Sequence, residues 1–196
     1  VLLSGSIKVI DVETLEVIQT ISPIAGGATS IAASPDGELL ALGISNNRTL
    51  LIHAEDGSVY RNLKSNYGGW SVAFSPDSQF VVSGTSQGIL KWETQTGIWK
   101  PMNGGQDKIV RSLAFSQDGK TIAGGGDGFL FFWDTETGEL LRQIDNENFG
   151  EVNSLDFSPD DLLLVTGTDD NIVRIWDVSS ASVLRELTGH SAAISG

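Results

Sequence analysis

A four-residue turn recurs along this chain at a nearly constant spacing. Proline at the second position, followed by Asp and often Gly, favours a tight turn, and each copy separates two short apolar segments. Such a period predicts repeated units of short strands joined by turns. The turns are Ser34-Pro35-Asp36-Gly37, Ser75-Pro76-Asp77-Ser78, Ser116-Gln117-Asp118-Gly119 and Ser158-Pro159-Asp160-Asp161, and their starts are 41, 41 and 42 residues apart.

A second marker follows the same period. An apolar strand ends on a two-residue signature at Ile10-Asp11, Ile52-His53, Trp92-Glu93, Trp133-Asp134 and Trp176-Asp177, at steps of 42, 40, 41 and 43 residues. The middle strands of each unit, such as Phe129–Trp133, are almost continuously apolar, which is typical of a strand that is covered on both faces. Turns and strand endings together predict about four strands in each unit.

The period, the four strands and the Trp-Asp endings resemble the WD-repeat (Trp-Asp repeat) β-propeller family, in degenerate repeats of a bacterial type. Thr188-Gly189-His190 supplies the Gly-His half of that signature. The resemblance implies an all-β propeller of four-stranded antiparallel blades, about four complete and partial at both ends. We expect one incomplete propeller domain over residues 1–196, with repeats near 1–23, 24–64, 65–103, 104–146, 147–187 and 188–196.

The two ends of the chain raise the question of ring closure. The chain opens inside one repeat, and its single Met is Met102, so we expect a piece of a longer protein. Val1–Ser4 and Ala192–Ser195 could pair to complete a fifth blade and close a ring. The family resemblance implies a larger ring of about seven blades. We therefore expect an open arc, with the closed ring of five blades as the alternative.

Charge and composition limit the classes of partner. The net charge is −13, from 12 basic and 25 acidic residues, and such a surface repels phosphate backbones. We therefore expect no nucleic acid, and we allow a basic protein or peptide as the partner. No apolar run has the length of a membrane span, so we expect no membrane either. The absence of cysteine is compatible with a reducing, cytoplasmic compartment.

The resemblance also implies a hydrogen-bonded set inside each blade: a Trp, a Ser or Thr, a His and an Asp. No repeat in this sequence has all four, because Gly124 stands at the Ser position of the fourth repeat and Asn148 lies near the His position of the fifth. These residues have a structural role in the family. The retained members are Trp92 and Ser83, Trp133 and Asp127, Trp176, Thr166 and Asp170, and finally His190.

As a function, we expect a non-enzymatic scaffold that binds a protein or peptide through loops at one face of the propeller. Exposed aromatic residues and Arg are the types that most often anchor a partner, which favours Tyr67, Phe149 and Arg48. For each of them, ordinary loop surface is the alternative. The full set of expected partner-binding residues is Arg48, Tyr67, Phe149, Asn47, Gln87, Lys108, Asp127 and Asp169.

The alternative class is a propeller enzyme, a hydrolase or quinone-dependent dehydrogenase with an ion or cofactor at the central channel. Two histidines and no cysteine leave few groups for acid–base or metal chemistry, and we assign no catalytic, metal-binding or cofactor-binding residue. The run Gly124–Gly128 lacks the Lys-Ser/Thr of a phosphate-binding loop. Asp145–Gly150 has Phe149 where a calcium loop needs a ligand.

Overall fold

The structure, a computed structural model, describes residues 6–21, 27–44, 48–65, 67, 69–145 and 149–196. In these segments every regular element is a β-strand. The first sheet holds β1 (Ile7–Ile10) and β2 (Val17–Ile21). Blade two holds β3 (Ala28–Ala33), β4 (Leu39–Ile44), β5 (Arg48–His53) and β6 (Val59–Lys64); blade three holds β7 (Ser71–Phe74), β8 (Phe80–Thr85), β9 (Gly88–Glu93) and β10 (Trp99–Pro101). Blade four holds β11 (Ser112–Phe115), β12 (Thr121–Gly126), β13 (Phe129–Asp134) and β14 (Leu140–Asp145); blade five holds β15 (Val152–Phe157), β16 (Leu163–Thr168), β17 (Val173–Asp177) and β18 (Ser182–Leu187).

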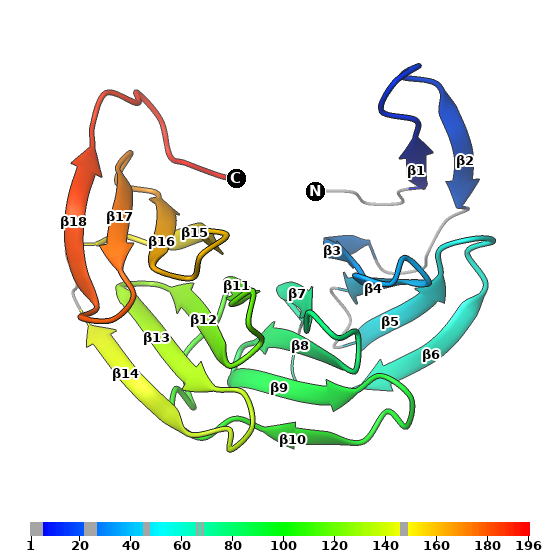
Figure 1. Ribbon diagram of the computed structural model, residues 1–196, viewed down its shortest axis with the longest axis horizontal. Coiled ribbons are helices and arrows are strands. Elements are labelled where there is room, and N and C mark those ends of the chain that lie inside the picture. The colour runs from blue at the N-terminus through cyan, green and yellow to red at the C-terminus, as the bar shows by residue number, and fades with distance from the viewer. Residues whose placement is uncertain (1–5, 22–26, 45–47, 66, 68, 146–148) are drawn as a thin grey trace.

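The strands of each blade pair in chain order and antiparallel, so every blade is a meander. Figure 1 shows the blades side by side in an arc, with β3, β7, β11 and β15 on the inner side and β6, β10, β14 and β18 on the outer side. This arrangement confirms the expected all-β propeller of four-stranded blades.

The hydrophobic core lies between neighbouring blades rather than inside one of them. Along β13, Phe131 and Trp133 pack in a cluster with side chains of blade three, whereas Leu130 and Phe132 pack in a cluster with side chains of blade five. This explains why the strand reads as a continuous apolar run. The signature tryptophans of the three blades, Trp92, Trp133 and Trp176, are exposed by only 1%, 0% and 3%, as the sequence predicts.

The recurring turn is held by one hydrogen-bond pattern in four copies. In blade three, the Ser75 hydroxyl donates to Asp77 at 2.6 Å and accepts the N–H of Phe80 at 2.9 Å. Asp77 also accepts the N–H of Gln79 at 3.0 Å. The fourth turn residue has a positive φ, which glycine adopts most easily, yet Ser78 adopts it at 60°. The same Ser–Asp bonds hold the turns that begin at Ser34, Ser116 and Ser158.

Two of the non-glycine turn residues also tie neighbouring blades together. The Ser78 hydroxyl accepts the N–H of Asp36 in the turn of blade two, at 3.2 Å. The Asp161 carboxylate accepts two N–H groups, from Gln117 at 2.6 Å and Asp118 at 2.9 Å, in the turn of blade four. These bonds between blades offset the backbone strain of a positive φ at a residue with a side chain.

The stability of the fold should fall when the pH drops below about 4. A hydrogen bond from Ser34 and then the N–H of Glu38 lower the pKa of Asp36, and bonds from Ser179 and then Ser180 lower the pKa of Asp177 to about 2. As the pH falls, the two carboxylates therefore bind protons at a higher pH in the unfolded chain than in the folded one. The two carboxylates contribute their full stabilisation above the unfolded pKa of about 3.9, and this stabilisation is lost as the pH falls toward the folded pKa.

The midpoint of urea denaturation, measured between pH 6 and pH 2, tests this prediction. We expect the midpoint to hold down to about pH 4 and to fall below it. The variant Asp177→Asn should show a smaller fall over the same range. A midpoint that is constant or rises on acidification would contradict the prediction.

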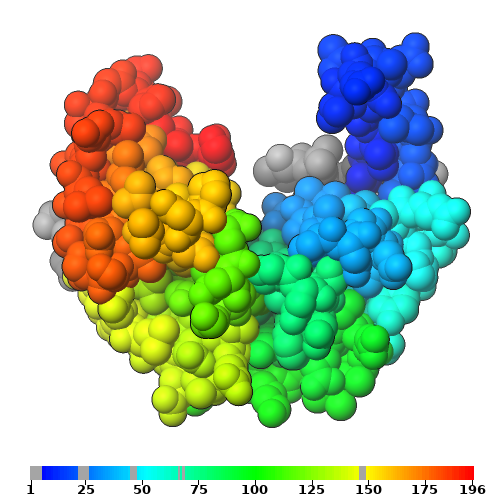
Figure 2. Space-filling model, viewed as in Figure 1, coloured from blue at the N-terminus to red at the C-terminus, as the bar shows by residue number. Residues whose placement is uncertain are grey.

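The arc is open at both ends. β1 pairs only with β2 among the described residues, and Figures 1 and 2 show these strands across an opening from the C-terminal segment. Val165 of blade five is 40% exposed, whereas Val82 and Ala123, at the same position of blades three and four, are 0% exposed. The face of β16 that points away from blade four is thus only partly covered by the described residues. Val1–Ser4, and with them one end of the expected closing contact, lie outside the described residues.

The C-terminal segment forms no β-strand, so the first strand that the alternative closed ring places at Ala192–Ser195 is absent, and that prediction is wrong. Ile194 nevertheless occupies the place where a following blade begins. Its N–H donates to the Thr168 carbonyl at 3.0 Å, as the N–H of Val110 donates to the Thr85 carbonyl in blade three. It also lies against Gly167, where a Cβ would come within 2.4 Å of its side chain. With no following strand to pair with, this contact alone does not make a ladder.

Candidate functional site

Each blade has two ends that face solvent, and we name them by their connections. The loop end carries the segment that enters the first strand and the hairpin between the second and third strands. The turn end carries the Ser–Asp turn and the hairpin between the third and fourth strands. β7 begins and β8 ends at the loop end, because Ser71 is opposite Gly84 in the antiparallel register.

The indole N–H of the signature Trp donates to a different acceptor in each of blades three, four and five. The indole N–H of Trp92 donates to the Ser83 hydroxyl at 3.0 Å, and that of Trp176 donates to the Thr166 hydroxyl at 3.0 Å. In blade four Gly124 has no hydroxyl, and the indole of Trp133 donates instead to the backbone carbonyl of Asn103 at 2.9 Å. These buried bonds position the blades and leave the indoles unavailable to a ligand.

Asp170 belongs to a buried ionic network that the sequence does not reveal. Arg174 is 4% exposed, and its guanidinium lies 2.6 Å from Asp170 and 2.9 Å from Glu186. The Thr168 hydroxyl donates to Asp170 and accepts from Arg174. Burial alone would raise the pKa of Asp170, but the hydrogen bonds from Arg174 and Thr168 lower it below its ordinary value. The network joins three strands of blade five.

The clearest exposed cluster at the loop end is a strip across three blades, which we call the loop-end strip: Trp70, Ile109, Arg111 and Glu151. Trp70 and Ile109 are each 40% exposed. The Arg111 guanidinium lies 4.9 Å from the centroid of the Trp70 ring and forms an ion pair with Glu151. Trp70 immediately precedes β7 in blade three, and Glu151 precedes β15 in blade five. Blade four contributes both Ile109 and Arg111, which lie just before β11.

Two of the expected partner-binding residues meet this strip. Asp127, in the second hairpin of blade four, forms an isolated β-bridge with Glu151. Asp169, in the corresponding hairpin of blade five, accepts the N–H of Glu151 at 2.7 Å. Lys108 lies next to Ile109 in the chain and pairs with Asp145 at 3.8 Å. The loop-end strip and its neighbours therefore combine the Trp70 ring, the Arg111 guanidinium and several carboxylates.

The other expected residues are dispersed. Tyr67 is half-buried and packs against the core between blades two and three. Phe149 is half-buried, and its ring is nearly perpendicular to that of Trp176, with the two centroids 5.2 Å apart. Arg48 begins β5 and is half-buried. Gln87 and His190 are exposed. Asn47, together with Asn148, lies outside the described residues.

Sequence reasoning missed Trp70, Ile109, Arg111 and Glu151, although one signal was present. Arg111 and Glu151 are 40 residues apart, close to the repeat period, and so is the separation of Trp70 from Arg111. Residues one period apart occupy equivalent places on neighbouring blades. Nothing in the sequence predicts that Trp70 is exposed, because a Trp directly beside a strand is expected to be a core residue.

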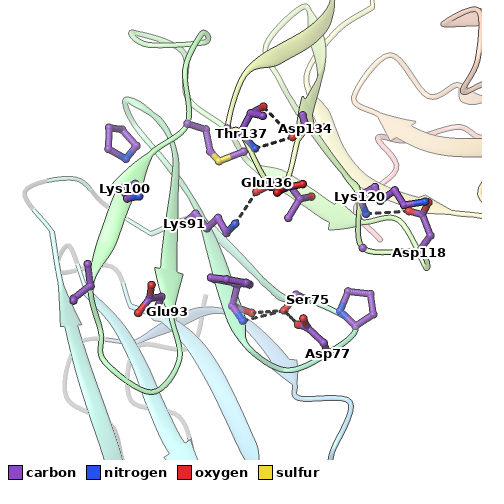
Figure 3. Close-up of a pocket in the computed structure, with 18 residues that line it drawn as sticks. Ser75, Asp77, Lys91, Glu93, Lys100, Asp118, Lys120, Asp134, Glu136 and Thr137 are labelled. Carbon is purple, nitrogen blue, oxygen red and sulfur yellow. Dashed lines mark hydrogen bonds and ion pairs between the residues drawn. The ribbon is translucent and has the colours of Figure 1, made fainter.

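A pocket of about 640 Å³ lies at the turn end, between blades three and four (Figure 3). We call it the turn-end pocket. The Lys91 ammonium reaches across the gap between the blades and donates to the Thr135 carbonyl at 2.6 Å. It also lies 3.9 Å from the centroid of the Phe80 ring. Burial, and then the nearby charge of Lys100, lower the pKa of Lys91.

Two further features are absent from the described residues. No group of three or more His, Asp or Glu side chains in those segments could hold a metal ion. In the same part of the chain, no helix is long and apolar enough to cross a membrane.

Comparisons with known proteins agree with this geometry. The family described as WD domain, G-beta repeat matches residues 56–92, 99–134 and 138–177, more than half of the chain. Cilia- and flagella-associated protein 52 of Sus scrofa is 33% identical over 57 residues, which are 29% of this chain and 9% of that protein. General transcriptional corepressor TUP1 of Saccharomyces cerevisiae is 33% identical over 63 residues, again 29% of this chain and 9% of that protein. Periodic tryptophan protein 2 of Arabidopsis thaliana is 40% identical over 47 residues, 24% of this chain and 5% of that protein.

The matched segments thus span less than a tenth of each of these curated relatives. They carry the repeat itself and not the remainder of those proteins. The repeat model, the four-stranded blades and the buried signature tryptophans lead to the same conclusion, which is that this chain belongs to the WD-repeat family.

Proposed function

We propose that the chain is a non-enzymatic module that binds a protein or peptide through the loop-end strip. The observation that carries the proposal is the exposed Trp70 ring, held by Arg111, which is itself held by Glu151. The similarity to a general transcriptional corepressor supports an interaction role in general terms.

The chemistry of the strip suits a protein partner. Trp and Arg are the residues that most often dominate binding energy at interfaces, because each buries a large contact area and keeps a polar handle. The cation–π contact and the ion pair hold both side chains in place before a partner arrives, which reduces the entropy lost on binding. A partner on this strip touches three blades at once, and the rigid blades hold those contacts at fixed relative positions.

The charge of the chain favours basic partners over nucleic acid or anionic membrane surfaces. The net charge is −13, and Asp127, Asp169 and Glu151 add carboxylates at the strip itself. A basic peptide would gain electrostatic attraction during approach, whereas phosphate groups would be repelled.

The test is selection of binders from a displayed library of random dodecapeptides on the immobilised full chain. The enriched peptides are then measured against two alanine variants by fluorescence anisotropy. Trp70→Ala should weaken binding at least tenfold, because the ring is the central contact. Trp99→Ala is the matched control: Trp99 is 42% exposed, close to the 40% of Trp70, but it lies on the outer strand β10.

Three outcomes would contradict the proposal. The first is no enrichment of any peptide, and the second is equal loss of binding in the two variants. The third is loss in Trp99→Ala alone, which would place the contact on the outer edge of blade three. Circular dichroism of both variants checks that the β-structure is retained.

A further inference from the structure

We infer that the turn-end pocket is a second binding site, and that its occupant is a peptide segment with an apolar side chain next to a Lys or Arg. It lies on the face opposite the loop-end strip, so this inference goes beyond the proposed function. The pocket lies where blades three and four diverge, and both blades contribute walls.

The walls of the pocket offer a place for an apolar side chain. Phe80, Pro101 and Met102 line it from blade three, together with Ile98 at its edge. Ile98 is 60% exposed, an unusual position for a large apolar side chain that no neighbour covers. A volume of about 640 Å³ is within the range of small-ligand sites, about 300–1,000 Å³, and is larger than one side chain needs.

The charges around the pocket favour a cation beside that apolar group. Five carboxylates line it, from Asp77, Glu93, Asp118, Asp134 and Glu136, against the ammonium groups of Lys91, Lys100 and Lys120. Two of those ammonium groups are engaged: Lys91 donates to the Thr135 carbonyl, and Lys120 lies 3.3 Å from Asp118. An incoming Lys or Arg thus meets a surplus of negative charge.

The acidic side chains are fixed before an occupant arrives. Asp134 accepts the N–H and the hydroxyl of Thr137, at 2.7 Å and 2.9 Å, and those bonds lower its pKa. Glu93 accepts the hydroxyl of Thr96 at 2.7 Å. Because a carboxylate has about four acceptor sites, each can still accept from a cation. Figure 3 shows Asp134, Glu136 and Glu93 around the opening.

An unsatisfied polar group also lines the pocket. Thr135 is buried, with 8% of the residue exposed, and its hydroxyl has no hydrogen-bond partner among the described residues. A buried hydroxyl without a partner is destabilising, and a peptide N–H or C=O that reaches this hydroxyl would supply the missing hydrogen bond. Thr94 of blade three has an unsatisfied hydroxyl at the equivalent place but does not line the pocket.

The single methionine of the chain can report on whether this pocket is occupied. Met102 is the only Met, and it lines the pocket. The full chain labelled with ¹³C at the methionine methyl group gives one resonance, which a pocket occupant must shift. The probe is the acetylated, amidated pentapeptide of sequence Gly-Leu-Arg-Leu-Gly, and two control peptides replace either its Arg by Glu or both Leu by Ser.

We expect the Leu-Arg peptide to shift the Met102 resonance in a saturable way, and both control peptides to bind at least tenfold more weakly. Glu136→Lys should weaken the Leu-Arg peptide at least tenfold. The matched control is Glu55→Lys, which changes the same turn position of blade two and the same net charge, away from the pocket. Its affinity should stay within twofold of the wild type.

Several results would overturn the inference. They are an unmoved Met102 resonance with the Leu-Arg peptide, equal binding of the Glu peptide, and equal effects of Glu136→Lys and Glu55→Lys. Trp70→Ala separates the two faces, because it should leave this titration unchanged even if it abolishes binding at the loop-end strip. A loss in Trp70→Ala with none in Glu136→Lys would assign the peptide to the loop end instead.

Discussion

Replacing Trp133 by alanine should destabilise the protein by about 3–5 kcal/mol. The side chain is completely buried between blades three and four, where its ring packs in a T-shaped contact with Phe131, with the centroids 5.6 Å apart. The change removes a large apolar group and leaves a cavity that β-strands on both sides cannot close. It also leaves the Asn103 carbonyl without the indole N–H that it accepts at 2.9 Å.

Urea denaturation followed by circular dichroism measures this loss, and two variants provide controls. Trp99→Ala removes the same side chain from a surface position that is 42% exposed, and it should cost far less than the buried change. Asp36→Ala breaks one exposed turn and should cost about 1 kcal/mol or less. Similar losses of stability in Trp133→Ala and Trp99→Ala would mean that the cavity between the blades is not the main cause of the destabilisation.

Replacing Arg174 by methionine should cost about 3 kcal/mol, the lower end for a broken buried ion pair. Methionine keeps most of the apolar volume, so the loss reports on the charge network. Without the guanidinium, Asp170 keeps its charge in a site where its side chain is only 22% exposed. The value stays at the lower end because the Glu186 side chain is 49% exposed and water can replace its lost partner.

Denaturation of two further variants decides whether the network is the cause. Arg185→Met changes an exposed arginine on the neighbouring strand β18, and it should alter stability by no more than about 0.5 kcal/mol. In Arg174→Met with Asp170→Asn, the uncompensated charge is gone, and part of the lost stability should return. If the double variant is less stable than Arg174→Met by the full cost of Asp170→Asn alone, the two residues are not coupled.

The sequence predicts the fold well because its markers are local. Each Ser–Asp turn is held by bonds within five residues, so a short motif such as Ser75–Phe80 contains its own geometry. The Trp92–Ser83 bond follows from pairing register, since both residues lie on adjacent strands whose register the hairpin fixes. By contrast, the repeat pattern places Asp170 in the hydrogen-bonded set that includes the Trp. In the structure, the long Arg174 side chain reaches Asp170 from the next strand and pairs with it instead.

The candidate binding surfaces are less predictable, because they depend on what a neighbouring blade covers. Tyr67 and Phe149 occupy loops, where an aromatic ring is expected to be exposed, but the adjacent blade gives each of them a core to pack against. Trp70 precedes a strand and has no such cover. The turn-end pocket combines turns from two repeats, and a one-repeat motif contains no information about the space between them.

The exposure of Val165 has a consequence for how residues 1–196, taken by themselves, lose structure. A blade in the middle of the arc is held by two interfaces and an end blade by one, so the chain behaves as a linear array with nearest-neighbour coupling. Opening then begins at an end and proceeds inward, and it costs one interface at each step. Trp70 sits on blade three, the middle one of the five sheets and the one that such fraying reaches last, and Arg111 sits on the adjacent blade four. The loop-end strip can therefore keep its aromatic centre while the outermost strands exchange between closed and open states.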